Sequence, residues 1–140
     1  MGDAAPAANF AADRLARERW AARDVAGWCE LFDPHRSRYV DPVFGAFEGR
    51  EAIRRWLTAT MRRAGSWRSR EAGPRFFDGF VAAGEAELRI PLAGSDLVLP
   101  FAWIQRYEDG AIVYRRDYYD THELRRRVPA RALEWGGVAR

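Results

Sequence analysis

Asp117 is the side chain in this sequence with the clearest chemical potential. It lies within residues 112–120, where apolar and polar side chains alternate as in a strand and the acid has aromatic and basic neighbours. A carboxyl group whose pKa burial shifts toward neutrality can give or accept a proton. The segment therefore predicts a pocket acid at Asp117, with an ion pair to Arg115 or Arg89 as the structural alternative.

Two turns predict which side chains accompany Asp117. Asp109–Gly110 suits a two-residue hairpin turn, which places Ala102 opposite Asp117. A four-residue loop over residues 93–96 then places Glu87 opposite Ala102. One face of three strands would carry the charged side chains, namely Glu85, Glu87, Arg89, Arg115 and Asp117. Since antiparallel sheets often expose one face to water, a solvated charged face is the alternative.

Asp41 is the second candidate acid or base. It lies in residues 39–43, a short strand that Pro42 ends, and it shares a face with Tyr39. In a pocket, Asp41 would serve as a base and Tyr39 would hold water or stabilise charge. The structural alternative for Asp41 is a turn residue whose side chain caps nearby amides. The structural alternative for Glu87 is an exposed strand glutamate.

The surrounding segments predict helices first and a sheet afterwards. Helical periodicity covers residues 9–22, 25–32 and 51–64. A loop over 45–49 is followed by strand patterns over 67–77, 80–92, 97–107 and 112–120. This order predicts an α+β fold with helices across a concave antiparallel sheet and a cone-shaped pocket between them. The helical stripes carry large side chains that pack a core or line that pocket, namely Trp20, Trp28, Trp56 and Met61.

Composition limits the possible functions. The 140 residues suit one domain, with a disordered start over 1–8, a folded domain over 9–128 and a C-terminal extension over 129–140. All 23 basic residues are arginine, which excludes Schiff-base chemistry and a phosphate-loop lysine. A net charge of only +3 argues against a nucleic-acid partner. The single Cys29, with no long apolar run and no signal-peptide pattern, predicts a cytoplasmic protein without a membrane partner.

The sequence predicts no metal and no cofactor. His35 and His122 have no partner at ligand spacing. The absence of a Gly-rich phosphate loop and of a Gly-x-Ser-x-Gly elbow argues against nucleotide binding and serine hydrolase chemistry. A small-molecule substrate is the expected partner.

Four segments, in this order, resemble the nuclear transport factor two-like superfamily and within it the SnoaL-like branch. They are residues 20–32, Tyr39-Val-Asp-Pro-Val-Phe-Gly45, Gly49-Arg-Glu-Ala-Ile-Arg54 and Gly110-Ala-Ile-Val-Tyr-Arg-Arg-Asp-Tyr-Tyr-Asp120. The resemblance covers nearly the whole chain. It implies a cone-shaped α+β barrel in which N-terminal helices pack on a curved antiparallel sheet.

Limonene epoxide hydrolases have a closing strand similar to residues 116–120. The acid matching Asp117 works there with a second acid, which Glu87 could match, and with an arginine. Glu85 stands where that arginine is expected, so Arg89 or Arg115 would have to substitute. The tyrosine and asparagine that hold the water in those enzymes resemble Tyr39 and Asp41.

Two other groups of relatives imply proton transfer on carbon. Ketosteroid isomerases have their base in a segment similar to Asp41-Pro42-Val43, although their oxyanion partners fall here near Ala16 and Ala102. SnoaL-type polyketide cyclases use a closing-strand acid without cofactor or metal. The cyclases fit the residues of this chain best.

The resemblance therefore implies a cofactor-independent acid–base enzyme that cyclises or isomerises an apolar, oxygenated small molecule. The implied catalytic residues are Asp117, Asp41, Glu87, Arg89 and Tyr39. The implied substrate pocket comprises Trp20, Trp28, Trp56, Met61, Pro100, Ala102, Arg115 and Tyr119. Epoxide opening, or a non-catalytic ligand-binding or dimerisation module, is the alternative. If the charged strand face turns inward, the apolar face needs cover, which predicts a homodimer through the sheet.

Overall fold

The computed structural model describes residues 4–64 and 67–134, which form four helices and six strands. The helices are α1 (Ala4–Ala21), α2 (Val25–Cys29), α3 (Arg50–Arg63) and α4 (Thr121–Arg127), and a 3-10 turn follows at Ala130–Ala132. The strands are β1 (Arg38–Asp41), β2 (Gly45–Glu48), β3 (Arg68–Phe77), β4 (Val81–Ile90), β5 (Leu97–Glu108) and β6 (Ala111–Tyr119).

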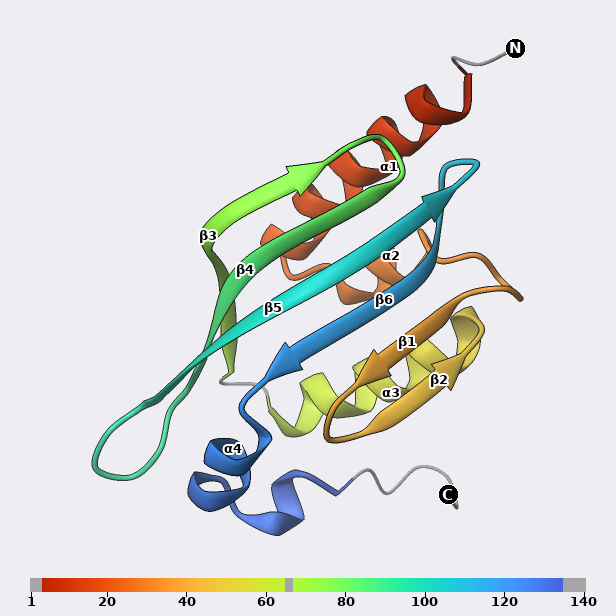
Figure 1. Ribbon diagram of the computed structural model, residues 1–140. Helices are drawn as coiled ribbons and strands as arrows, with labels where there is room; N and C mark the ends of the chain where they lie inside the picture. The colour runs from red at the N-terminus through yellow and green to blue at the C-terminus, as the bar shows by residue number, and fades with distance from the viewer. Residues whose placement is uncertain (1–3, 65–66, 135–140) are drawn as a thin grey trace.

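The strands form one curved sheet in the order β2-β1-β6-β5-β4-β3. Neighbouring strands are antiparallel except for β1 and β6, which run parallel. Helices α1, α2 and α3 lie on one side of the sheet, behind it in Figure 1. The sheet is not closed into a barrel, so space remains between its inner face and the helices. The predicted α+β class, with helices over a curved sheet, is confirmed.

Local sequence signals explain several element boundaries. The Asp24 carboxylate accepts a hydrogen bond from the Gly27 amide at 2.8 Å and caps α2. Asp120 caps α4 in the same way through the Glu123 amide at 2.9 Å. At the β5–β6 turn, Asp109 and Gly110 have φ angles of 50° and 79°, as a tight hairpin turn requires.

Two of the differences from the sequence prediction concern α1 and β2. α1 begins at Ala4 instead of residue 9, because alanine favours helix and Pro6 lies in the first turn, where proline is tolerated. Residues 45–48 form β2 where a loop is predicted, since they pair with β1. Residues 1–3 and 135–140, at the ends of the predicted start and extension, lie outside the described residues.

A β-bulge in β6 changes the predicted register of this closing strand. The ladder between β5 and β6 skips Val113, which is an extra residue. From Tyr114 onward the pairing is displaced by one position, so Asp117 lies opposite Trp103 and not opposite Ala102. Because a one-residue displacement exchanges the two faces of a strand, Asp117 shares its face with the apolar residues of β5.

The loop between β4 and β5 is longer than predicted. Ile90 pairs with Leu97, so the loop covers residues 91–96 and Glu87 lies opposite Pro100. This displacement by two positions keeps each β4 residue on its predicted face. Together with the bulge in β6, it separates the charged residues of β4 from those of β6. The prediction that both sets share one face is therefore wrong.

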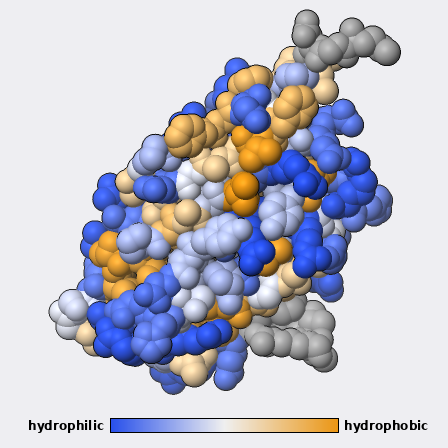
Figure 2. Space-filling model, in the orientation of Figure 1, coloured by the Kyte–Doolittle hydropathy of each residue, from blue (hydrophilic) through white to orange (hydrophobic). Residues whose placement is uncertain are grey.

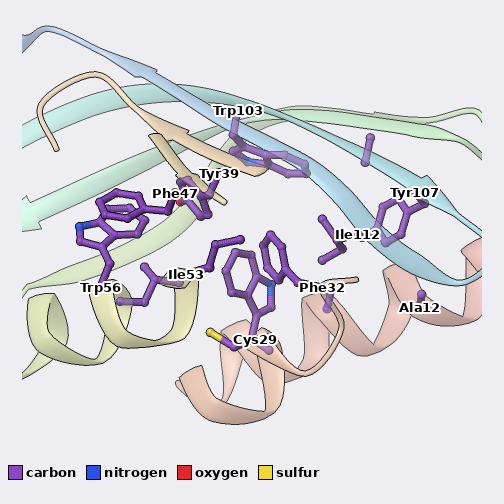
Figure 3. Packing of buried hydrophobic residues seen from close by; sticks show 14 of the residues in the cluster. Ala12, Cys29, Phe32, Tyr39, Phe47, Ile53, Trp56, Trp103, Tyr107 and Ile112 are labelled. Atoms are coloured by element: carbon purple, nitrogen blue, oxygen red, sulfur yellow. The ribbon is translucent and has the colours of Figure 1, made fainter. Parts of the chain in front are cut away.

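Aromatic side chains fill the core between the helices and the sheet. Phe47 stacks on Trp56 with ring centroids 4.4 Å apart, and Tyr39 meets the same indole edge-on at 4.8 Å. Trp28 packs edge-on against Phe32 at 4.9 Å. Figure 3 shows the rings of Phe32, Tyr39, Phe47 and Trp56 between the helices and the strands. Since aromatic pairs add stabilisation beyond their buried area, this packing fixes the position of β1, which carries two predicted site residues.

The outer face of the sheet is mixed in character. Figure 2 shows hydrophilic and apolar side chains interspersed on this side of the molecule. The strongly apolar strand face is the inner one, where Leu99 and Trp103 are buried. The helices and the core therefore cover the apolar face, so the condition for the predicted homodimer, an inward charged face, is not met, and the homodimer stays a prediction.

Asn9 is expected to contribute strongly to stability because it joins α1 to two hairpin turns. Its Nδ2 donates to the Gly79 carbonyl and its Oδ1 accepts from the Gly110 amide, both at 2.8 Å, and the side chain is fully buried. In Asn9→Ala both backbone groups lose their partner, which should lower the free energy of unfolding in urea by about 2–3 kcal/mol. The exposed control Glu18→Ala should change it by less than about 0.5 kcal/mol, and equal effects would contradict the prediction.

Candidate functional site

The space between the helices and the inner sheet face contains a hollow of about 360 Å³. We call it the acid pocket, because its wall includes both candidate aspartates. The predicted site residues that line it are Tyr39, Asp41, Asp117, Arg115, Tyr119, Trp20, Trp56 and Met61. Leucine and aromatic side chains from α3, β4 and β5 form much of the remaining wall. Two carboxylates in a largely apolar wall suit a small molecule that is mostly apolar.

Asp117 is held by two partners inside the acid pocket. The Tyr39 hydroxyl donates to its Oδ2 at 2.5 Å, and the Arg115 Nε donates to its Oδ1 at 2.8 Å. Arg115 and Asp117 are both over 90% buried. The ion pair that the sequence offered as an alternative for Asp117 is therefore present, with Arg115 as the partner. Burial and the nearby Asp117 charge raise the pKa of Tyr39, which keeps this hydroxyl protonated.

A buried chain of hydrogen bonds continues from Arg115 away from the acid pocket. Arg115 Nη1 donates to Gln105 Oε1 at 3.1 Å, and Gln105 Nε2 donates to the Tyr107 hydroxyl at 2.7 Å. The Tyr107 hydroxyl donates to Asp13 Oδ1 at 2.9 Å, and this oxygen also accepts from Arg75 at 2.5 Å. The chain fixes the Arg115 guanidinium on the side opposite Asp117.

The sequence prediction does not include the residues that continue this hydrogen-bond chain beyond Arg115. Gln105 and Tyr107 could not be placed beside Arg115 from the sequence, because the bulge in β6 determines which face of β5 meets Asp117. A signal for Asp13 exists, since Asn9, Ala12, Asp13 and Ala16 form a buried stripe at helical spacing. Two polar residues within such a stripe indicate buried hydrogen bonding.

Asp41 has a different environment from Asp117, although it lines the same pocket. Its Oδ1 accepts from the amides of Val43 and Phe44 at 2.8 and 2.9 Å, in the turn that follows β1. The Tyr119 hydroxyl lies 2.9 Å from Oδ1 and 3.1 Å from Oδ2. No arginine pairs with Asp41 among the described residues.

Asp41, which has no arginine partner among the described residues, has a raised pKa. Burial raises this pKa to about 6, the Phe44 and Val43 amides lower it in part, and the Asp117 charge adds to the rise. Burial and the Asp41 charge likewise raise the pKa of Tyr119, so its hydroxyl stays protonated. Asp41 is thus a carboxyl group that gains and loses a proton near neutrality, beside a neutral hydroxyl donor.

Five predicted site residues do not line the acid pocket. Glu87 pairs with Arg70 at 3.1 Å and Arg89 with Asp96 at 3.3 Å, both on the outer side of the sheet. Pro100 and Ala102 share that outer face with them, because they alternate with the inward Phe101 and Trp103. Their expected placement beside Asp117 is wrong for the reason given above, namely the bulge in β6. Trp28 is a buried core residue behind the pocket.

The sequence comparison agrees with this architecture. The model of the SnoaL-like domain family matches residues 12–115, which extend from α1 to Arg115 in β6. The chain belongs to the SnoaL-like domain family. The match contains most of the fold and ends two residues before Asp117. No curated protein is similar enough to be matched to the chain.

Solved structures similar to this SnoaL-like domain have the same fold at low sequence identity. TerC, crystallised with polyporic acid, is 19% identical with a TM-score of 0.70, and the alignment covers 85% of this chain and 96% of TerC. A protein from a Jannaschia species assigned to the SnoaL-like polyketide cyclases is 18% identical, with a TM-score of 0.68 and coverage of 89% and 92%. A Catenulispora acidiphila protein with a ketosteroid isomerase-like fold, bound to trimethylamine, is 21% identical, with a TM-score of 0.65 and coverage of 79% and 85%.

The described part of the SnoaL-like domain, residues 4–64 and 67–134, has two further properties. None of its helices is long and apolar enough to cross a membrane. It also contains no group of three or more histidine, cysteine, aspartate or glutamate side chains placed to hold a metal ion.

Proposed function

We propose that this SnoaL-like domain is a cofactor-independent acid–base enzyme of the cyclase or isomerase type, acting on an apolar small molecule with a carbonyl group. The observation that carries the proposal is Asp41, a buried carboxyl group with a pKa raised to about 6 in the wall of an apolar pocket. A general base is most effective when its pKa lies near the working pH. Structural neighbours that include a SnoaL-like polyketide cyclase support the same class.

Asp41 is the proposed base. Its Oδ1 is fixed by two backbone amides, whereas Oδ2 has only the longer contact with the Tyr119 hydroxyl. Oδ2 would take a proton from a carbon next to the substrate carbonyl, and the electron pair of that C–H bond would form an enolate. Return of the proton at another carbon gives isomerisation. Attack of the enolate carbon on a second carbonyl of the same molecule closes a ring and leaves an alkoxide, which takes the proton back from Asp41.

Tyr119 and Arg115 are the proposed groups that stabilise the enolate. Once Asp41 has taken the proton, the Tyr119 hydroxyl no longer faces a carboxylate and can donate to the enolate oxygen. The Arg115 guanidinium lies in the same pocket wall and offers positive charge in a site poor in water. Asp117 and Tyr39 hold that guanidinium in place. In this proposal Asp117 has an electrostatic role and Asp41 carries the proton.

Epoxide opening has less support than proton transfer on carbon. In the resemblance described above it needs a second acid beside Asp117, for which Glu87 is the candidate. Glu87 lies on the outer face of the sheet, in an ion pair with Arg70. The two carboxylates that share the acid pocket are instead Asp117 and Asp41.

Exchange of a carbon-bound proton tests the proposal without knowledge of the natural substrate. β-Tetralone is apolar and has acidic protons next to its carbonyl, so its deuterium uptake from D₂O can be followed by NMR. The wild type should accelerate exchange at least about 100-fold over buffer, with a rate that rises with pH through about 6 as Asp41 loses its proton. Asp41→Asn should reduce the exchange to the buffer rate, and the exposed control Asp96→Asn should not. Equal exchange by wild type and Asp41→Asn would refute the role of the base.

A further inference from the structure

A second hollow lies beside the acid pocket, between α1 and the inner face of β3, β4 and β5. It has a volume of about 660 Å³. Trp20 and Arg115 line both hollows, and the Trp20 Nε1 donates to the Ser69 hydroxyl at 2.9 Å, joining α1 to β3 at the boundary. We call this second hollow the arginine cleft. Of the groups used in the proposed proton transfer, Arg115 also lines this cleft.

Arginines dominate the wall of the arginine cleft, and two of them have little or no pairing. Arg14, Arg17, Arg70, Arg75 and Arg115 line it together with Glu18 and Glu71. Three of these arginines are paired with carboxylates: Arg70 with Glu87 on the outer side of the sheet, Arg75 with Asp13, and Arg115 with Asp117. Within the described residues Arg14 has no ion pair or hydrogen bond from its side chain, and Arg17 has only a 3.6 Å contact with Glu71. These two side chains project from the exposed face of α1, so their charges are available to a ligand.

The inner part of the cleft is aromatic, and its two guanidinium groups are each paired with a buried aspartate. Trp103 lies on its floor, with the Arg115 guanidinium 4.6 Å and the Arg75 guanidinium 5.4 Å from its ring centroid. Phe101 and Trp20 complete an aromatic surface. The Nε of Arg75 is buried and has no hydrogen-bond partner among the described residues. A buried donor without a partner is costly, and an acceptor oxygen supplied by a ligand would offset that cost after a small shift of the side chain.

We propose that the arginine cleft is a binding site for a planar aromatic anion, such as an aryl carboxylate. The ring packs against Trp103 and Phe101, and the carboxylate lies toward Arg17 and Arg14. Apolar floor and cationic rim together match this chemistry, since arginine binds carboxylates through planar, charge-assisted hydrogen bonds and the ring gains apolar contact. Its carboxylate contacts, Arg14 and Arg17, are not used in the proton transfer proposed for the acid pocket.

Naphthoate and naphthamide provide a matched pair of probes, because they share a ring system and differ in charge. Calorimetric titration of the wild type should show naphthoate binding at least about tenfold more tightly than naphthamide. The double variant Arg14→Gln/Arg17→Gln should weaken naphthoate binding about five- to twentyfold and leave naphthamide binding within about twofold, since exposed charge pairs contribute modestly. Added salt should weaken only naphthoate binding.

A variant of the acid pocket serves as the control for location. Arg23 lines that pocket and not the arginine cleft, and it donates to the Trp67 carbonyl at 3.0 Å. Arg23→Gln should leave naphthoate binding unchanged. Three results would each overturn the proposal: equal affinity for the two probes, a loss in Arg23→Gln with none in the double variant, or no saturable naphthoate binding up to about 10 mM.

Discussion

Asp41→Asn is expected to remove catalysis and, at the same time, to stabilise the fold at neutral pH. Loss of a general base typically costs about 100- to 10,000-fold in rate. The stability gain follows from burial, because the wild type must keep an ionised Asp41 in a site that raises its pKa to about 6. A shift of roughly two units from the unfolded value corresponds to about 2–3 kcal/mol at pH 7. Asparagine avoids this cost, since its oxygen can still accept from the Val43 and Phe44 amides.

The pH dependence of this stability difference has a definite sign. The folded state binds the Asp41 proton more tightly than the unfolded state, whose carboxyl has a pKa of about 3.9. The wild type therefore loses stability relative to Asp41→Asn as the pH rises from about 4 to about 6. The difference should vanish below about pH 4 and be complete above about pH 6–7. Urea unfolding of both proteins across this range measures it.

Asp117→Asn is the matched comparison, and it should have the opposite effect on stability. Asp117 neutralises the buried Arg115, so its removal leaves a buried cation without its partner. The two aspartates lie in one pocket, and each variant replaces one carboxylate oxygen with an amide nitrogen. If Asp41→Asn were destabilising at pH 7, the carboxylate would be structurally paired and its role as a base would lose its main support.

Arg115→Leu is expected to be the most destabilising single change in the site. It removes the cation beside Asp117 and the donor to Gln105, and both groups remain buried. Breaking a buried ion pair in this way costs about 3–5 kcal/mol in the free energy of unfolding.

A double-mutant cycle identifies the source of that loss. In Arg115→Leu/Asp117→Asn neither buried charge remains, so the double variant should be more stable than the sum of the two single changes predicts. An additive result would show that Arg115 and Asp117 do not stabilise each other. The exposed pair of Arg89 and Asp96 is the control, where the same cycle should give less than about 1 kcal/mol of coupling.

The helices and strands could be predicted from the sequence because their signals are local. The capping residues Asp24 and Asp120, the turn at Asp109–Gly110 and the apolar stripe of α3 each act within a few residues. β2 was not predictable in this way, because its four residues form a strand only through pairing with β1. The early start of α1 lies in an alanine-rich segment with Pro6 in the first turn, and Asn9 joins this segment to Gly79 and Gly110, which are distant in sequence.

The composition of the site could be predicted only in part. Asp41, Asp117, Tyr39 and Tyr119 line the pocket, and short segments of β1 and β6 carry them. The partner of Asp117 could not be chosen between Arg115 and Arg89, because that choice depends on which strand faces turn inward. The extra residue Val113 decides which faces turn inward, and the types of the neighbouring residues do not indicate a bulge at this position.

The bulge at Val113 also determines how this chain can be compared with its relatives. An alignment with a closing strand that lacks the bulge needs a gap of one position at Val113. Without that gap, Arg116 would be matched to the inward acid, and Asp117 would be read as an exposed residue. The number of residues between the hairpin turn and the acid, more than their identity, decides which side chain enters the pocket.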